Sequence, residues 1–184
     1  MTRDQILRAI NDPNYVLPPG AQAGRLCAEL AALGAIGGEY GIVAATPAKG
    51  VVLQIERLLI INSGAVDNYR VCLATAKDMA VVASTESNLV NFVALSGVDA
   101  PAGTKLSSKV SSYDTSGMAV ADVIGNQFLA RRVPAGLDSE IVFPAPGVIL
   151  LGDDPSGAPS LAVELLAHDV FACFFAREWP LPPR

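Results

Sequence analysis

The chain has 184 residues, which is enough for one domain with a substantial hydrophobic core. Hydrophobic residues make up 51% of the chain and charged residues only 17%, against about 25% in an ordinary soluble domain. The net charge is −5 and the only adjacent basic pair is Arg131-Arg132, which argues against nucleic acids and anionic membranes as partners, because both require a clustered basic face.

Residues 1–38 are expected to form an arm, because they hold too few apolar residues for a core of their own. Thr2 and Gln5 form a capping-box pattern, which predicts that a short helix begins here. Pro13 ends this helix, because proline cannot continue the helical hydrogen-bond pattern. Residues 14–20 contain adjacent prolines and are expected to be extended.

A second helix is predicted over residues 21–33, where leucines recur at helical spacing: Leu26, Leu30 and Leu33. Gly34 would end it, since glycine readily adopts the left-handed conformation that follows a helix. Further glycines follow at positions 37, 38 and 41, but their spacing matches no phosphate- or dinucleotide-binding motif. We therefore interpret the glycine cluster as a hinge between the arm and the rest of the chain.

Residues 39–180 are predicted to form an antiparallel β-sandwich or jelly roll, so the protein is expected to be mainly β. Short apolar or alternating runs recur about every ten residues, with turn-forming residues between them. The run Val170–Ala176 is apolar on both faces, which is typical of a central strand covered on both sides. Residues 181–184 form a proline-rich tail, and the ending 179–184 is not expected to extend a sheet as an edge strand, because proline lacks the N–H. The expected strands are 53–61, 69–74, 79–84, 89–95, 105–111, 127–132, 140–143, 148–151, 161–166 and 170–176.

The three cysteines, Cys27, Cys72 and Cys173, lie far apart and form no C-x-x-C pair. This pattern suggests neither a zinc ribbon nor a disulfide framework. Cys72 and Cys173 stand in apolar stretches, which is typical of small buried side chains in a reducing compartment. The N-terminus leads into no apolar signal segment, so synthesis in the cytoplasm is expected.

Candidate catalytic residues are few. His168 is the single histidine, whereas zinc and iron sites of the common types need several imidazoles. No G-x-S-x-G motif accompanies it, and we interpret His168-Asp169 as a turn between two apolar strands. The sequence therefore predicts no catalytic, cofactor-binding or metal-binding residue, and a protein that is not an enzyme.

Two charged pairs leave alternatives open. Asp153-Asp154 begins a turn of ordinary composition, although a calcium ion held by both carboxylates is the alternative. Arg131-Arg132 is interpreted as a solvated strand end, with an acidic partner as the alternative. The scarcity of charge together with apolar excess favours burial against other protein chains, although abundant alanine also raises the apolar count.

The arm, the all-β body rich in Gly, Ala and Val, and the closing runs 146–152 and 170–179 resemble the jelly-roll cement or decoration proteins of tailed bacteriophages. The resemblance implies a structural virion protein that binds and stabilises the outer capsid lattice. It implies the major capsid protein and further copies of the chain, as a homodimer or homotrimer, as partners. It also implies a place on the virion after synthesis in the host cytoplasm, and an arm that becomes ordered on docking.

Two other functions compete with this one. The first is a trimeric jelly-roll head of a phage fibre or tail that binds a receptor or glycan. Such heads use exposed aromatic side chains, and this chain has one Trp and four Tyr. The second is a carboxylate-dependent hydrolase that uses Asp153, Asp154 and His168, which is the least favoured of the three.

Overall fold

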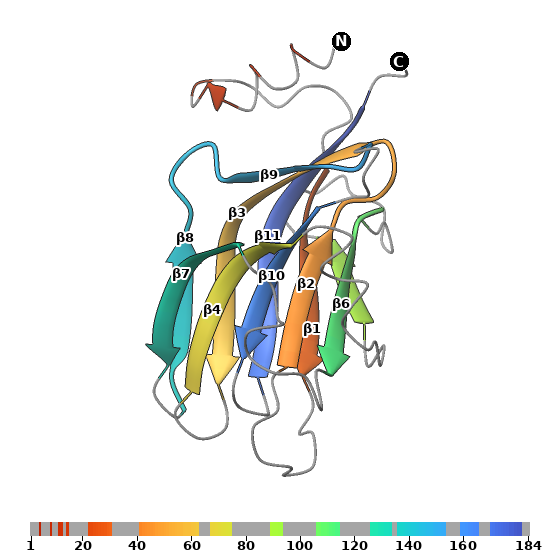
Figure 1. Cartoon of the computed structure of the whole chain (residues 1–184). Coiled ribbons are helices and arrows are strands. Elements are labelled where there is room, and N and C mark those ends of the chain that lie inside the picture. The colour runs from red at the N-terminus through yellow and green to blue at the C-terminus, as the bar shows by residue number, and fades with distance from the viewer. Residues whose placement is uncertain are drawn as a thin grey trace.

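A computed structural model describes residues 4, 8, 11, 12, 14, 22–30, 41–62, 67–74, 89–93, 106–114, 126–133, 136–153, 159–165 and 170–181. Within these ranges, eleven strands form two antiparallel sheets that pack face to face (Figure 1). The prediction of a mainly β protein with an antiparallel sandwich is confirmed.

Sheet A has six strands in the order β5-β1-β11-β3-β8, and β9 also pairs with β3. Its strands are β1 (Gln22–Leu30), β3 (Val51–Asn62), β5 (Leu89–Val93), β8 (Asp138–Val142), β9 (Val148–Leu151) and β11 (Val170–Pro180). Sheet B has five strands in the order β6-β2-β10-β4-β7. Its strands are β2 (Gly41–Thr46), β4 (Asp67–Ala74), β6 (Lys109–Asp114), β7 (Asn126–Val133) and β10 (Ser160–Leu165).

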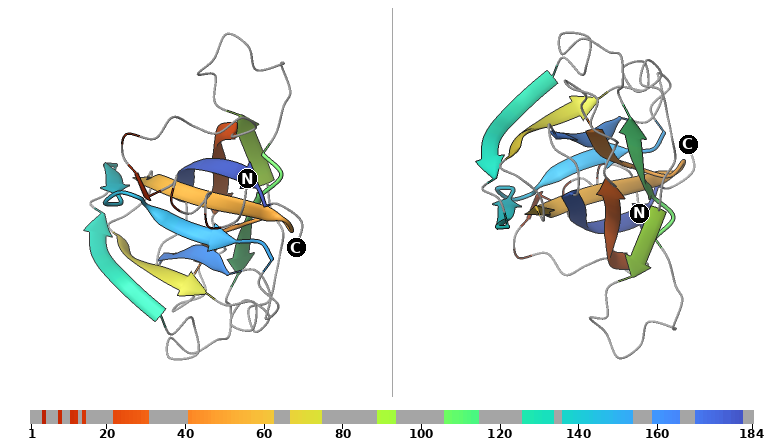
Figure 2. Two further views of the ribbon diagram at one scale, coloured as in Figure 1. Left: turned by 90° about the horizontal axis from the view of Figure 1, so that it is seen from above. Right: turned by 90° about the horizontal axis from the view of Figure 1, so that it is seen from below.

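The strand pairing is that of a jelly roll. β1 pairs with β11 and β3 with β8 and β9 in sheet A, while β2 pairs with β10 and β4 with β7 in sheet B. Each of these pairs lies, in the sequence, within the one before it: β1 with β11, then β2 with β10, then β3 with β8 and β9, then β4 with β7. Successive pairs belong to alternate sheets, as they do when one long antiparallel hairpin is rolled into two layers. β5 and β6 are additional strands between β4 and β7 in sequence, and they extend the two sheets at the same edge (Figure 2).

The core lies between the two sheets and is apolar. Alternate residues of each strand point into it because successive side chains of a strand face opposite ways. Phe174, at the centre of β11, is fully buried there between Ala172 and Ala176. The other fully buried aliphatic members from both sheets include Leu26, Val43, Leu53, Ile55, Leu58, Ile60, Val71, Leu161 and Val163.

One buried carboxylate joins sheet A to the segment that leads into β6. Glu178 of β11 is 6% exposed. Its Oε1 accepts hydrogen bonds from the backbone N–H of Ser107 at 2.6 Å and from the Ser107 hydroxyl at 2.8 Å. Its Oε2 accepts a third from the N–H of Ser108 at 3.1 Å. These bonds offset the cost of burying a carboxylate.

The expected second helix is wrong, because Gln22–Leu30 is strand β1 and lies between β5 and β11. Leu26 points into the core, and Gly24 lies against Leu106, where a Cβ would come within 2.9 Å of the Leu106 side chain. Hydrogen-bonded pairing along both edges of the segment therefore overrides its helical leucine spacing. Part of the expected arm thus contributes a strand to sheet A.

Other expectations for the N-terminal region are only partly described. Asp4, Arg8 and Asn11 have helical conformation, but the residues between them lie outside the described part, so the bounds of the first helix stay a prediction. Most of the expected extended stretch 14–20, the glycines at 34–38 and the expected strand 79–84 also lie outside the described residues. Among the described residues, no helix has the length and apolar character needed to cross a membrane.

The remaining expected strands are present; 148–151 has the expected bounds and the others have shifted bounds. The strand expected at 105–111 begins at Lys109 and continues to Asp114, and β2 was not singled out by its sequence. The central position of β11 is confirmed, but its coverage on both sides is not, because Phe171 and Phe175 are partly exposed. At the end of β11, the N–H of Leu181 donates to the Gly50 carbonyl at 2.7 Å.

The expectation for the cysteines is also corrected. Cys27 and Cys173 form a disulfide, with their Cα atoms 4.1 Å apart, while Cys72 is buried and keeps its thiol. Cys27 of β1 and Cys173 of β11 stand directly opposite each other in the strand register. Since 146 residues separate them, only the order of strands in the sheet reveals that they are neighbours.

Candidate functional site

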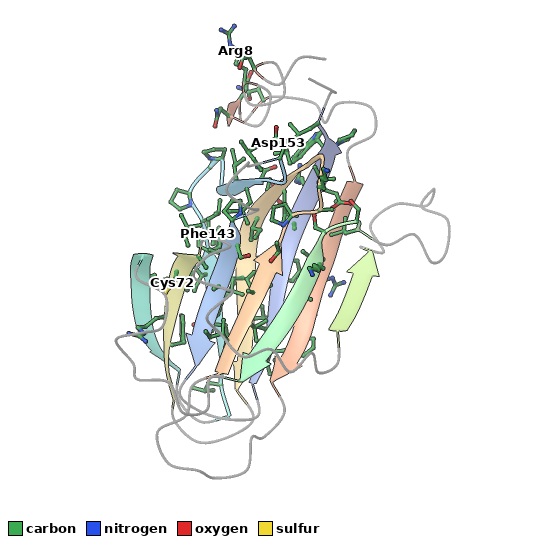
Figure 3. All side chains as sticks on the ribbon, turned by 45° about the vertical axis from the view of Figure 1, so that its right-hand side comes forward. Arg8, Cys72, Phe143 and Asp153 are labelled. Atoms are coloured by element: carbon green, nitrogen blue, oxygen red, sulfur yellow. A yellow bond between two sulfur atoms is a disulfide. The ribbon has the colours of Figure 1, made fainter. Side chains whose placement is uncertain are left out.

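The charged residues that the sequence singled out do not form a described site. Asp153 follows β9 and lies at one end of the sandwich, the end beyond which Arg8 is placed (Figure 3). Asp154 and His168 lie outside the described residues. Within the described part, no group of three or more His, Cys, Asp or Glu side chains is placed to hold a metal ion. Arg131 and Arg132 lie on β7, opposite Tyr69 and Asn68 of β4.

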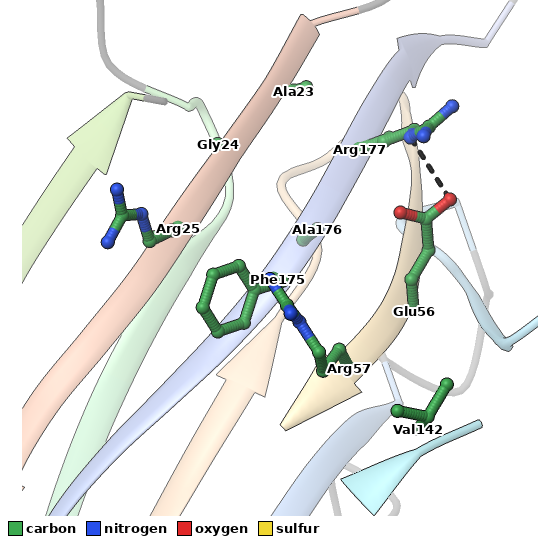
Figure 4. Close-up of a pocket in the computed structure, with 9 residues that line it drawn as sticks. All are labelled: Ala23, Gly24, Arg25, Glu56, Arg57, Val142, Phe175, Ala176 and Arg177. Atoms are coloured by element: carbon green, nitrogen blue, oxygen red, sulfur yellow. Dashed lines mark ion pairs between the residues drawn. The ribbon is translucent and has the colours of Figure 1, made fainter. Parts of the chain in front are cut away.

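The described surface carries a groove on the face of sheet A that points away from sheet B (Figure 4). The groove crosses β1, β11 and β3 and reaches the end of β8, and its volume is about 520 Å³. Ligand-binding clefts typically enclose about 300–1,000 Å³. We call it the arginine groove; its lining residues are Ala23, Gly24, Arg25, Glu56, Arg57, Val142, Phe175, Ala176 and Arg177.

Strand alternation places two of the cations and the aromatic ring on the same face. Phe174 points into the core, so Phe175 and Arg177 on either side of Ala176 point outward from β11. Arg25 of β1 stands directly opposite Phe175 in the register. Three outward side chains from two neighbouring strands therefore line the groove.

A β-bulge in β3 supplies the third cation. Phe175 pairs with Arg57 but Ala176 pairs with Ile55, so Glu56 is an extra residue in β3. Ile55 and Leu58 on either side of the bulge are fully buried, and both Glu56 and Arg57 are left on the outer face. Bulges commonly redirect side chains in this way next to functional sites.

The turn between β8 and β9 holds the bulge in place. The N–H of Phe143 donates to the Glu56 carbonyl at 3.0 Å, and the Gln54 amide donates to the Pro146 carbonyl at 2.6 Å. Gly147 has a φ of +81°, and a Cβ on it would come within 2.5 Å of the Ile55 carbonyl oxygen. Only glycine fits at position 147, because other residues rarely adopt this φ and because a Cβ would clash with the Ile55 carbonyl.

Two of the three cations lie over the Phe175 ring. The Arg57 guanidinium carbon lies 3.9 Å from the ring centroid and that of Arg25 lies 5.6 Å from it, both within the range of cation–π attraction. Arg57 Nη1 pairs with Glu140 Oε1 at 2.9 Å. Arg177 Nε pairs with Glu56 Oε1 at 3.0 Å.

Positive charge exceeds negative charge in the groove. Arg25, Arg57 and Arg177 face two carboxylates, and no described carboxylate side chain forms an ion pair with Arg25. The paired side chains are between 36% and 47% exposed, so water weakens these ion pairs. A guanidinium stacked on a ring keeps its N–H groups in the plane, where they bind carboxylates or phosphates in pairs. The groove is therefore suited to binding anions.

Sequence reasoning did not single out any of these arginines. Each stands alone in the sequence, and the nearest two, Arg25 and Arg57, are in different strands. The available signal was the outward position of Arg177 beside the apolar run of β11. That position indicates a shared site only once the strands beside β11, which carry Arg25 and Arg57, are known.

Comparisons with protein-family models, with curated proteins and with solved structures found no match to this chain. Its fold and groove define it as a jelly-roll β-sandwich with a cationic groove on the outer face of one sheet.

Proposed function

We propose that this chain is a structural virion protein of the cement or decoration kind, which binds and stabilises the outer lattice of a capsid. The observation that carries the proposal is the arginine groove, which lies on the outer face of sheet A. A groove that is open to solvent suits contact with a protruding segment of a large partner surface. The strands already order the backbone beneath the groove, so little backbone conformational entropy is lost when a partner docks.

The disulfide supports a place on the outside of a particle. Disulfides persist on virion and cell surfaces, whereas the reducing cytoplasm disfavours them. The bond between Cys27 and Cys173 ties β1 to β11 on the same outer face that carries the groove. A chain made in the host cytoplasm would then form this bond after release.

Exposed apolar side chains support contact with further protein chains, either the major capsid protein or copies of this chain. Val142 is 68% exposed and Leu137 is 56% exposed, and both lie at the ends of β8, an outer strand of sheet A. Apolar side chains on an outer strand are a common feature of protein contact surfaces. A homodimer or homotrimer built on this edge is part of the proposal.

The alternative, a head that binds receptors or glycans, has less support from the described aromatic residues. Trp179 is 3% exposed and Tyr69 is 1% exposed, so neither offers a bare ring for a sugar to stack on. The ring of Phe175 is more accessible, but Arg57 already lies over it.

Reconstitution tests the proposal. Capsids assembled from the major capsid protein of the same source are mixed with the purified chain and sedimented through a sucrose gradient. We expect saturable co-sedimentation and a higher temperature of capsid disruption, measured by light scattering. Capsids of an unrelated phage serve as the control. A chain that stays at the top of the gradient at every concentration contradicts the proposed function.

A further inference from the structure

We propose that the arginine groove binds an extended, carboxylate-rich peptide segment of a partner protein. The inference rests on the proposed function, because it names the face and the chemistry through which the chain would dock on a capsid subunit. It goes beyond that function in assigning the contact to Arg25, Arg57 and Arg177 and in specifying the charge of the partner.

Charge complementarity is the first argument. The chain as a whole has a net charge of −5, yet this groove concentrates three guanidinium groups against two carboxylates. An acidic partner is repelled by most of such a molecule and attracted here. Local complementarity of this kind fixes the orientation of docking and suppresses wrong partners.

The spacing of the cations is the second argument. Arg25 pairs with Phe175 across the strands, and Arg177 lies two residues further along β11. Arg25 and Arg177 are therefore diagonal neighbours, whose backbones lie about 7–8 Å apart. In an extended peptide, alternate side chains repeat at about 6.8 Å. Carboxylates on alternate residues of an extended segment thus match the two arginines in spacing.

The ion-pair geometry is the third argument. The pair of Arg57 with Glu140 uses Nη1, and the pair of Arg177 with Glu56 uses Nε. Each guanidinium has further N–H groups that a second carboxylate can occupy. Stacking on Phe175 holds Arg57 in one orientation, so its donors are positioned before the ligand arrives. Sugar stacking has no such support, since the guanidinium lies over the ring.

A fluorescein-labelled hexaglutamate peptide is the probe, and fluorescence anisotropy at low ionic strength is the measurement. We expect saturable binding that weakens as salt is added, because salt screens exposed charges. The variant Arg25→Gln should weaken binding by about tenfold, the effect of losing one charge-assisted contact. Lys109→Gln, which removes the same charge from an exposed position on sheet B, should bind like the wild type.

A second variant should change affinity in the opposite direction. Glu140→Gln releases Arg57 from its own carboxylate and should tighten hexaglutamate binding by about threefold, a small gain because the pair is exposed. The melting temperatures of Arg25→Gln and Glu140→Gln should stay close to that of the wild type, which shows that the fold is intact. The inference is overturned if hexaglutamate does not bind, if hexaglutamine binds equally well, or if Arg25→Gln binds like Lys109→Gln.

Capsid co-sedimentation with the same variants separates the two proposals. Loss of capsid binding in Arg25→Gln but not in Lys109→Gln supports both the proposed function and the arginine groove as the docking site. Capsid binding that is equal in all variants leaves the proposed function standing and overturns the groove as its docking site. Hexaglutamate binding that depends on Arg25, without any capsid binding by the wild type, supports the groove and overturns the proposed function.

Discussion

Strand β11 presents two adjacent phenylalanines to opposite environments. Phe174 points between the sheets, is fully buried, and packs among aliphatic side chains of both sheets. Phe175 points outward, is partly exposed, and lies against the guanidinium groups of Arg57 and Arg25. The same residue type therefore serves packing on one face and the orientation of charged groups on the other.

This difference separates the sources of stability and of binding in one strand. The inner face gains free energy by removing apolar surface from water, an effect that grows with buried area. On the outer face, water competes with every ion pair, so the arginines add little to stability. Those arginines are consequently available to a partner. Five variants, compared in three sets of decreasing expected effect, test this separation.

The largest effect is expected for Phe174→Ala. Removing a fully buried phenylalanine leaves a cavity and should lower the free energy of unfolding by about 3–5 kcal/mol. Phe175→Ala should lower it by about 1 kcal/mol, because the ring is already partly in water. Urea denaturation followed by circular dichroism measures both. If both variants lost the same free energy of unfolding, the two faces of β11 would contribute equally to stability, and the contrast that the structure indicates would be wrong.

An intermediate effect on the free energy of unfolding is expected from removing the disulfide, which lies on the outer side of β1 and β11. Replacing both Cys27 and Cys173 with alanine should lower the free energy of unfolding by about 2–4 kcal/mol, because the bond closes a long loop in the unfolded chain. Unlike the ion pairs, a covalent bond is not weakened by water. This outer-face interaction is therefore expected to stabilise the fold.

Thiol titration checks the same bond independently. The unreduced, denatured protein should show one reactive thiol, that of Cys72, and three after reduction. Wild-type protein denatured in the presence of reductant should lose as much stability as the double variant. Three reactive thiols without reductant would contradict the disulfide.

The smallest effect is expected for Glu56→Gln, which breaks the ion pair with Arg177. Both side chains are more than a third exposed, at 41% and 36%, so the loss should stay below about 1 kcal/mol. The matched variant Glu178→Gln alters a buried carboxylate that accepts three hydrogen bonds and should cost more. Urea denaturation measures both variants. If Glu56→Gln lowered the free energy of unfolding more than Glu178→Gln, the expected difference between the outer and inner faces would be wrong.

Local patterns predicted much of the fold. The alternating run 69–74 and the apolar run 170–176 are strands, and the second of them is central in its sheet. The helix predicted over residues 21–33 is wrong for the described residues 22–30, whose leucines fit a helix as well as a strand. Hydrogen bonding to β5 and β11 decided between the two, and no local pattern encodes those neighbours.

The candidate site was less predictable than the fold. Arg25, Arg57 and Arg177 are single charges within strands, and isolated charges on strands usually face solvent. The bulge at Glu56 is visible only as a shift in register between β3 and β11. A strand that gains one residue reverses the direction of every later side chain, so the positions of Glu56 and Arg57 could not be assigned from alternation alone.

The sequence by itself determined the class of fold, because the alternation and turn residues that make strands act over a few residues. Tertiary structure decided which strands are neighbours, and with them the disulfide, the bulge and the arginine groove. Each of these features joins residues that are distant in the chain. Such contacts depend on the free energy of the whole packed sandwich rather than on the preference of any one segment.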